Sequence, residues 1–128
     1  MRKNVQLVMQ LYSALAEKDV EAMQSLSDPN IEIHQSAELP WGGVYRGLSE
    51  AVQFFAKVTG FLDSKVTPEQ TIDAGDFVAV VGRTEGTVKQ TGRTFQVPLV
   101  HIWGVKHNRI TSLAVLLDYP SISSALKG

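Results

Sequence analysis

The sequence contains no cysteine among its 128 residues. This absence excludes disulfide bridges, thiolate catalysis and cysteine zinc sites, and it is compatible with a reducing compartment. No apolar run approaches the roughly 20 residues that a membrane-spanning helix needs. Basic residues are not in excess, because 12 Lys and Arg stand against 13 Asp and Glu. They are scattered, so no basic stripe suits a nucleic acid or an anionic membrane. We therefore expect a cytoplasmic protein with no nucleic-acid or membrane partner.

The composition is that of an ordinary globular domain, with 44% hydrophobic and 20% charged residues. A chain of this length buries roughly two-thirds of its unfolded surface, which is enough for a core without covalent staples. We expect residues 1–128 to form a single domain. The N-terminal Met-Arg-Lys-Asn leads into an amphipathic segment and not into an apolar run, so we expect no secretory leader.

Helical spacing is concentrated in the N-terminal half of the chain. Apolar residues recur on one stripe over residues 3–18. A shorter helix is expected after Asp19, a good N-cap, and before Pro29, which disfavours helical geometry in the preceding residue. A third helix is expected over residues 49–58, with Gly60 as its stop. The pattern thus predicts three helices before the main sheet.

Residues between the second and third helices have a different pattern. The alternation in residues 31–34 predicts a short strand. Residues 38–47 hold one proline and three glycines and are expected to form a loop. This loop carries Trp41 and Tyr45, and exposed loops seldom display large aromatic side chains that cover nothing.

After Gly60 the apolar period changes from helical spacing to alternation. Strands this long, joined by short polar turns, must be antiparallel neighbours. Pro98 is expected to cause a bulge or bend, while Gly82 and Gly104 permit tight curvature. A short helix over residues 119–126 ends the chain. The expected strands are 66–73, 77–88, 94–105 and 110–118.

The last two strands are apolar on both faces. In the final strand, Leu113, Val115 and Leu117 share one face. In the strand before it, Val100 and Ile102 share one face, and His101 and Trp103 lie on the other. A sheet with one solvated face should alternate apolar with polar residues. Since the helices can cover only the concave side, we expect a homodimer through the outer face, with His101 and Trp103 in the interface.

Several motifs in this order resemble the nuclear transport factor 2-like superfamily, and most closely its SnoaL-like and ketosteroid-isomerase-related proteins. The resemblance implies an α+β fold, a conical half-barrel of curved antiparallel sheet closed by three N-terminal helices. It also implies a small-molecule pocket and a homodimer. Isomerases, epoxide hydrolases, polyketide cyclases, dehydratases and binding modules share this scaffold. The motifs are LYSALAEKD (11–19), IEIH (31–34), VYRG (44–47) leading into FF (54–55), and VPLVHIW (97–103).

The resemblance also shows which catalytic acids are missing. The first-helix tyrosine of ketosteroid isomerases falls on Leu11. Their general-base aspartate falls on Gln35, or on His34 if the register slips by one, and their oxyanion-binding aspartic acid falls on Val100. Epoxide hydrolases of this fold use an Arg-x-Asp pair, which Arg83-Thr84-Glu85 imitates, and a last-strand aspartate, which is Val115 here. Close mechanistic kinship with either group is therefore not expected.

His34 and Gln35 are the candidate catalytic residues. A histidine has an ordinary pKa near 6.5, which suits proton transfer at neutral pH. The alternative is a strand-end histidine satisfied by backbone or water. Arg83 and Glu85 share a face of their strand, but the pattern does not decide which face, and a solvated ion pair is the simpler interpretation. The three histidines are dispersed, so we expect no metal site and no cofactor.

The expected ligand pocket is mostly apolar. Strand parity and the family positions predict that aliphatic side chains of the first helix and the last two strands form its wall. Aromatic side chains are expected near its mouth. The same aromatic residues could instead be plain core. The wall residues are Leu11, Val100, Ile102, Leu113, Val115 and Leu117, and the aromatic residues are Trp41, Tyr45 and Phe54.

Three functions remain compatible with these features. The first is a dimeric binding module for a small apolar or mixed-polarity molecule. The second is an isomerase, cyclase or dehydratase that moves protons, with His34 or Gln35 polarising the substrate. The third is a scaffold domain whose pocket is filled by its own side chains. Binding is favoured over catalysis. Proton-transfer catalysis needs a base with a pKa near neutrality and an oxyanion donor, and the sequence offers at most half of this set.

Overall fold

The computed structural model describes residues 3–128, so Met1 and Arg2, the start of the segment considered for a leader, lie outside it. Four helices and six strands follow one another along the chain. Their order is α1 Lys3–Ala16, α2 Val20–Ser25, β1 Ser27–Gln35, β2 Gly43–Arg46, α3 Gly47–Phe61, β3 Leu62–Asp73, β4 Phe77–Val88, β5 Thr94–Lys106, β6 Arg109–Leu117 and α4 Tyr119–Lys127.

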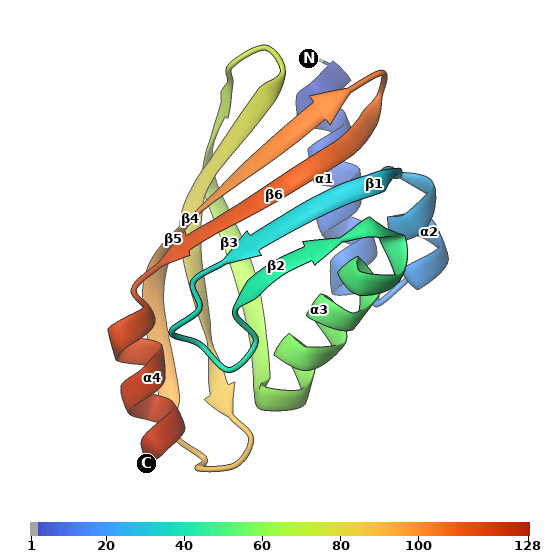
Figure 1. Ribbon diagram of the computed structural model, residues 1–128. Helices are drawn as coiled ribbons and strands as arrows, with labels where there is room; N and C mark the ends of the chain where they lie inside the picture. Colours follow the sequence, from blue (N-terminus) through green and yellow to red (C-terminus); the bar gives the residue numbers. More distant parts are fainter. Residues whose placement is uncertain (1–2) are drawn as a thin grey trace.

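The strands form one sheet in the order β2-β1-β6-β5-β4-β3 (Figure 1). The four strands from β3 to β6 make the predicted antiparallel meander. The β1 strand pairs antiparallel with β2 and parallel with β6. The last long strand therefore lies inside the sheet and joins the N-terminal hairpin to the meander.

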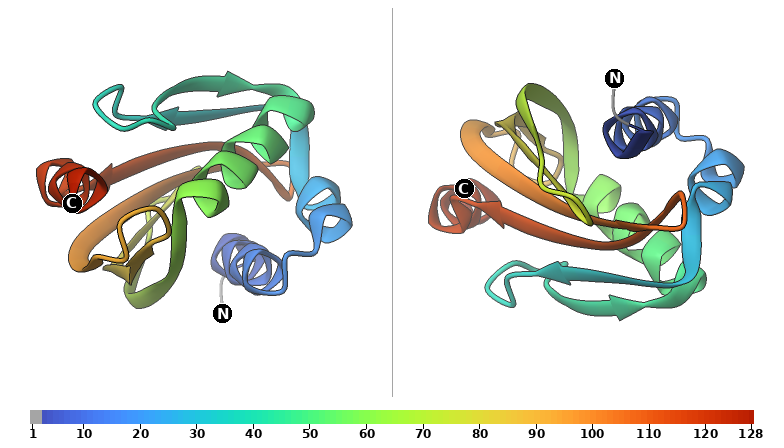
Figure 2. Two further views of the ribbon diagram at one scale, coloured as in Figure 1. Left: turned by 90° about the horizontal axis from the view of Figure 1, so that it is seen from below. Right: turned by 90° about the horizontal axis from the view of Figure 1, so that it is seen from above.

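The sheet curls around the helices, as the two end-on views in Figure 2 show. The α1 and α3 helices lie on its concave side, and α4 packs at one end against β5. The predicted α+β class and the curved, unclosed antiparallel sheet are confirmed.

Local chemistry explains where several elements begin. The Asp19 carboxylate accepts a hydrogen bond from the amide of Ala22, 3.1 Å away, and caps α2 as predicted. Asp118 caps α4 in the same way through the amide of Ser121. The β5–β6 turn holds His107 and Asn108, both with positive φ (51° and 59°). Two such residues make the kind of turn that matches the twist of a hairpin.

The structure differs from the sequence predictions at several places. The β1 strand begins at Ser27 and β3 at Leu62, both earlier than predicted. The expected loop 38–47 contains the short strand β2, and α3 continues through Gly60 to Phe61. Pro98 pairs in register with Arg83 and makes no bulge. The register instead shifts at Pro68 and Gln70 of β3, opposite Gly82, and at Gly104 and Val105 of β5. A Cβ at Gly82 would clash with the Thr67 carbonyl oxygen, so glycine permits this close approach of β3 and β4.

Over residues 3–128, no helix is long and apolar enough to cross a membrane. The cytoplasmic location stays a prediction.

Candidate functional site

A cavity of about 560 Å³ lies between the helices and the concave face of the sheet. It is enclosed by α1, α3, β3, β5 and β6, with Ile122 of α4 and Trp41 of the β1–β2 connection completing its wall. Most of its surface is apolar, and many of the lining side chains are aromatic. The aromatic residues around it are Tyr12, Trp41, Phe54, Phe55, Phe95, His101 and Trp103.

Three polar rings form a hydrogen-bonded cluster in the cavity wall. The Tyr12 hydroxyl lies 2.6 Å from His101 Nδ1. The indole N–H of Trp103 donates to the same hydroxyl at 3.0 Å. The Tyr12 and His101 rings stack at 5.8 Å, and the Trp103 ring stands edge-on to both. The hydroxyl of α1 thus ties the helix to two residues of β5.

Burial shifts the pKa of both titratable groups in this cluster. Loss of hydration lowers the pKa of His101 to about 4, so the imidazole is neutral at pH 7. The pKa of Tyr12 is raised, mainly because burial disfavours the phenolate, while the Trp103 hydrogen bond acts in the opposite direction. Both side chains therefore remain uncharged at physiological pH.

The lowered pKa of His101 predicts acid sensitivity. Below the ordinary histidine pKa of about 6.5, the unfolded chain binds a proton that the folded protein refuses until about pH 4. Stability is therefore full above pH 6.5 and is lost as the pH falls through the window down to 4. The free energy of unfolding should drop by about 2 kcal/mol between pH 7 and pH 5. Urea titrations at both pH values measure it.

The matched variant for this titration is His101→Phe. It keeps a flat ring at the position but cannot bind a proton, so its stability should change much less between the two pH values. An equal loss of stability in the variant and the natural protein would contradict the assignment to His101.

Few polar groups of the cavity remain available to a ligand. The Thr84 hydroxyl donates to the Lys65 carbonyl oxygen, and the Tyr12 and Trp103 groups are bonded to each other. Within residues 3–128, the Gln35 amide and His101 Nε2 make no hydrogen bond, and neither is wholly enclosed by protein atoms. Both residues line the cavity. These two groups are therefore the free polar contacts of the interior.

The charged residues that line the cavity are lysines. Lys18 follows α1 and is exposed at the rim, whereas the exposed Lys65 side chain pairs with Glu85 on the outer side of β3 and β4. Among the described residues that line it, none is an aspartate or glutamate. The site consequently has no anionic group to bind a cation.

Six of the predicted site residues line the cavity. The structure places alternate residues of β6 on the concave side, beside the cavity. Gln35 is there too, only 8% exposed. The six residues are Gln35, Trp41, Phe54, Leu113, Val115 and Leu117.

The predicted parity of β5 is wrong. Cross-strand pairing places Trp103 opposite Leu113 and His101 opposite Val115, so these residues share the concave face. Val100 and Ile102 pair with Leu116 and Ala114 and face outward. Because both faces of β5 are apolar, its alternation carried no information about direction. His101 and Trp103 therefore line the cavity and are not residues of an outer interface.

Two further predicted ligand contacts are corrected. Leu11 is buried in the core between α1, α2 and β1, and Tyr12, the next residue on the helix, reaches the cavity instead. Tyr45 packs on Phe54 from outside the cavity, and its hydroxyl donates to the Trp41 carbonyl oxygen.

His34 does not face the cavity. It is exposed on the outer side of β1, and its Nε2 lies 3.1 Å from a Glu32 carboxylate oxygen. The alternation of β1 places Gln35 inward and His34 outward, which removes His34 from any chemistry in the cavity.

The face of Arg83 and Glu85 is now defined. Both alternate with the inward-facing Thr84 and lie on the outer side of β4. Arg83 pairs with Glu69 at 3.0 Å and Glu85 with Lys65 at 3.8 Å. They form two cross-strand ion pairs and not one pair with each other.

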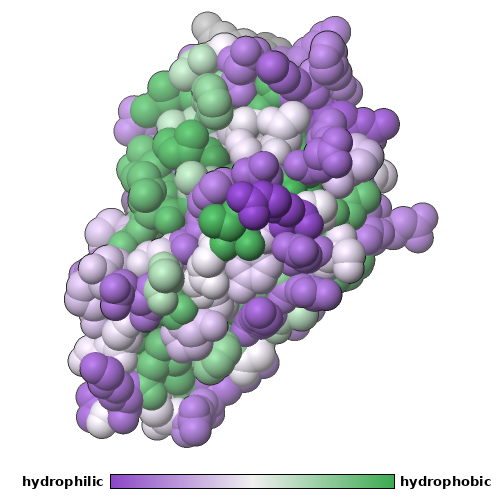
Figure 3. Space-filling model, in the orientation of Figure 1, coloured by the Kyte–Doolittle hydropathy of each residue, from purple (hydrophilic) through white to green (hydrophobic). Residues whose placement is uncertain are grey.

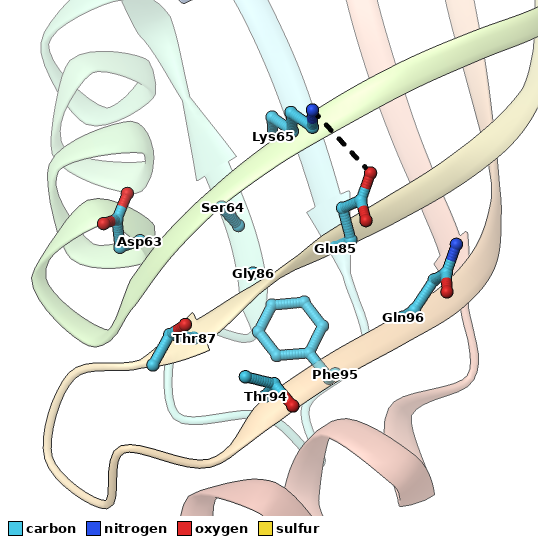
Figure 4. A pocket seen from close by; sticks show the side chains of 9 residues that line it. All are labelled: Asp63, Ser64, Lys65, Glu85, Gly86, Thr87, Thr94, Phe95 and Gln96. Atoms are coloured by element: carbon cyan, nitrogen blue, oxygen red, sulfur yellow. Dashed lines mark ion pairs between the residues drawn. The ribbon is translucent and has the colours of Figure 1, made fainter.

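A second, open depression crosses β3, β4 and β5 beside the Lys65–Glu85 pair (Figure 4). Apart from the buried Phe95, its side chains are short or at least partly exposed, and among them Lys65 and Glu85 point toward each other. It has no buried, convergent polar group. The enclosed cavity is therefore the better candidate site.

No group of three or more potential metal ligands occurs among the residues that the structure describes. The expectation that no metal or cofactor is needed stays a prediction.

The curved sheet, the covering helices and the apolar cavity define the class of small cone-shaped α+β domains. Residues 8–113 match the SnoaL-like domain family, and the chain belongs to this family. No curated protein matches the chain in sequence.

Solved structures support this assignment. A nuclear transport factor 2-like protein from Burkholderia thailandensis is 31% identical, with a TM-score of 0.91 and both chains fully covered. Another from Burkholderia xenovorans is 27% identical, with a TM-score of 0.90 over 97% of this chain and 95% of that one. TerC, co-crystallised with polyporic acid, shares the fold at 23% identity and a TM-score of 0.90, over 99% of this chain and 100% of that one.

Proposed function

We propose that this SnoaL-like protein binds one small, largely apolar molecule in the cavity. The observation that carries this proposal is an enclosed space of about 560 Å³ that is not filled by the protein's own side chains. This volume lies in the range of small-molecule sites, which are mostly apolar with a few placed polar groups. Gln35 and His101 supply those groups here.

Filling the cavity tests this proposal. Val115→Phe places a larger side chain in the space, whereas Ile102→Phe adds bulk on the outer face of the neighbouring strand. The fluorescent probe anilinonaphthalene sulfonate should bind the natural protein saturably. Its dissociation constant should rise about tenfold in Val115→Phe because of steric overlap. Titration by fluorescence measures both variants.

Ile102→Phe is the control and should bind the probe as the natural protein does. Failure of the natural protein to bind, or equal binding by both variants, would contradict a ligand site in the cavity.

A proton-transfer enzyme, such as an isomerase, cyclase or dehydratase, is the second candidate. The Tyr12–His101 hydrogen bond in an apolar cavity favours it, because such a pair could polarise a substrate oxygen. Binding has the better support, since a histidine with a pKa of about 4 is a weak base at pH 7. Faster deuterium exchange beside the carbonyl of a bound ketone would support catalysis.

We also propose that two copies pair through the outer face of the sheet. Half-buried apolar side chains from three adjacent strands form a patch on this face, and Leu116 at its edge is 57% exposed. Hydrophobic residues gather over β4 and β5 in Figure 3. An exposed apolar patch on the outer face of the sheet supports a symmetric interface between two copies of the chain. The outer patch consists of Ala79, Val81, Val100, Ile102, Ala114 and Leu116.

A charge in the outer patch should separate the copies. Ile102→Asp would bury a carboxylate in the interface, so light scattering should report half the mass of the natural protein. Gln96→Asp, on the same strand but outside the patch, is the control and should leave the mass unchanged. A monomeric natural protein, or a dimeric Ile102→Asp variant, would overturn the proposed interface.

A further inference from the structure

We propose that His101 presents its Nε2–H to the cavity, and that this donor selects ring-containing molecules that carry a hydrogen-bond acceptor oxygen. The inference rests on the proposed binding function and deepens it. His101 would thus distinguish ligands that have an acceptor oxygen from ligands of similar shape that lack one.

The direction of the hydrogen-bond chain carries the inference. An indole N–H can only donate, so Trp103 occupies one acceptor position of the Tyr12 oxygen. The tyrosine has one proton of its own, and the acceptor beside it is His101 Nδ1 at 2.6 Å. Trp103 therefore donates to Tyr12, and Tyr12 donates to His101.

The tautomer of the histidine follows from this direction. When Nδ1 of a neutral imidazole accepts, the single ring proton must be on Nε2. His101 lines the cavity, and its Nε2 has no partner within residues 3–128 and is not wholly enclosed. The imidazole thus offers the cavity a donor and not a lone pair, at a place where an unmet donor is costly.

The charges around the cavity disfavour organic cations as ligands. No described residue of its lining carries a carboxylate, and Lys18 is exposed at its rim. An organic cation would therefore lose its hydration without gaining a counter-charge. A neutral or anionic oxygen meets a donor inside and the Lys18 cation at the rim.

The shape of the wall favours rings over flexible chains. Trp41 and Phe54 face the cavity, and Phe95 and Trp103 approach it from the sheet. Aromatic walls pack best against flat molecules, by stacking or edge contacts.

Two probes that differ only at the acceptor test the inference. Fluorenone and fluorene are both flat three-ring molecules, and fluorenone has a carbonyl oxygen where fluorene has two hydrogens. Calorimetric titration gives the ratio of their dissociation constants. This ratio should move about tenfold against fluorenone in His101→Phe, because the donor is gone.

Gln35→Met tests the competing group, since it removes the other free polar side chain of the cavity while keeping a side chain of similar length. His34→Phe is the matched control, because it makes the same substitution at an exposed histidine outside the cavity. Both variants should leave the ratio unchanged. The infrared carbonyl band of bound fluorenone should lie at the hydrogen-bonded frequency in the natural protein and in Gln35→Met, and at the apolar-solvent frequency in His101→Phe.

The outcomes separate the two proposals. If neither fluorenone, fluorene nor anilinonaphthalene sulfonate binds, the binding function is wrong and this inference falls with it. If the probes bind but the ratio and the carbonyl band are unaffected by His101→Phe, or respond instead to Gln35→Met, only the role of His101 is overturned.

A measurement on the natural protein makes the test independent of variant folding. Nitrogen-15 NMR of labelled histidine distinguishes the two neutral tautomers. The His101 signals should be those of the Nε2–H form, and in Tyr12→Phe, which lacks the donor to Nδ1, they should shift toward a mixture. A natural protein in the Nδ1–H form would overturn the inference.

Discussion

Replacing Trp103 with alanine is expected to lower the free energy of unfolding by about 4 kcal/mol. The indole is 1% exposed and is among the largest fully buried side chains of the described chain. Its removal leaves a void beside Tyr12 and His101, whose rings it meets edge-on. It also removes the N–H that donates to Tyr12. Urea-induced unfolding followed by circular dichroism measures the loss.

Ile102→Ala is the control for this experiment, because Ile102 is the adjacent residue of β5 and faces outward. Its half-buried side chain loses less contact, so the cost should be less than half that of Trp103→Ala. A larger loss for Ile102→Ala would restore the parity that the apolar pattern first indicated, with Trp103 outside and Ile102 inside.

A carboxylate at Val80 should destabilise the protein by several kcal/mol at pH 7. Val80 is fully buried and lies across from His101 on the concave side of β4. Val80→Asp would therefore place an ionised group in an apolar environment without a counter-charge. Val81→Asp, one residue further on the outer face, should have a much smaller effect on each subunit. Urea titrations of both variants give the difference.

The destabilisation by Val80→Asp should depend on pH in a defined direction. In the folded Val80→Asp variant, burial should raise the pKa of the introduced carboxyl above its unfolded value of about 4. The unfolded chain then gives up its proton first as the pH rises. The loss relative to the natural protein, which itself weakens in acid through His101, should nearly vanish below pH 4 and grow as the pH climbs through the folded pKa of the new carboxyl. An equal loss relative to the natural protein at pH 4 and pH 7 would contradict a dry interior.

Much of the fold followed from sequence periodicity because long elements repeat their pattern many times. The β4 strand was predicted to the residue and β5 and β6 to within one residue at each end, whereas β3 begins at Leu62, earlier than the predicted residue 66. The four-residue strand β2 was missed, because a segment rich in glycine and proline indicates a loop until β1 supplies its partner. Likewise Gly60, a helix stop by rule, stays helical because α3 leads directly into β3.

The site was harder to predict, since it depends on which side chains of α1 and β5 point toward the cavity. Tyr12 and Leu11 are neighbours on one apolar helix, and which of them meets the cavity depends on how α1 is rotated against the sheet. His101 and Trp103 have polar atoms and were expected outside, where polar groups find water. The structure bonds His101 Nδ1 and the Trp103 indole N–H internally to Tyr12 and leaves His101 Nε2 toward the cavity. One signal was available: a tyrosine, a histidine and a tryptophan can satisfy one another only if they converge.

The central position of β6 has a consequence for how the chain folds. Its parallel pairing joins His34 to Ala114, so the β1–β2 hairpin has no neighbour in the sheet until the last strand leaves the ribosome. Contacts that distant in sequence are slow to form, because loop closure must come first. During synthesis the apolar concave surface stays uncovered at its middle. Cotranslational folding should therefore stop at the β3–β5 hairpins, and chaperones should meet the nascent chain before its pocket exists.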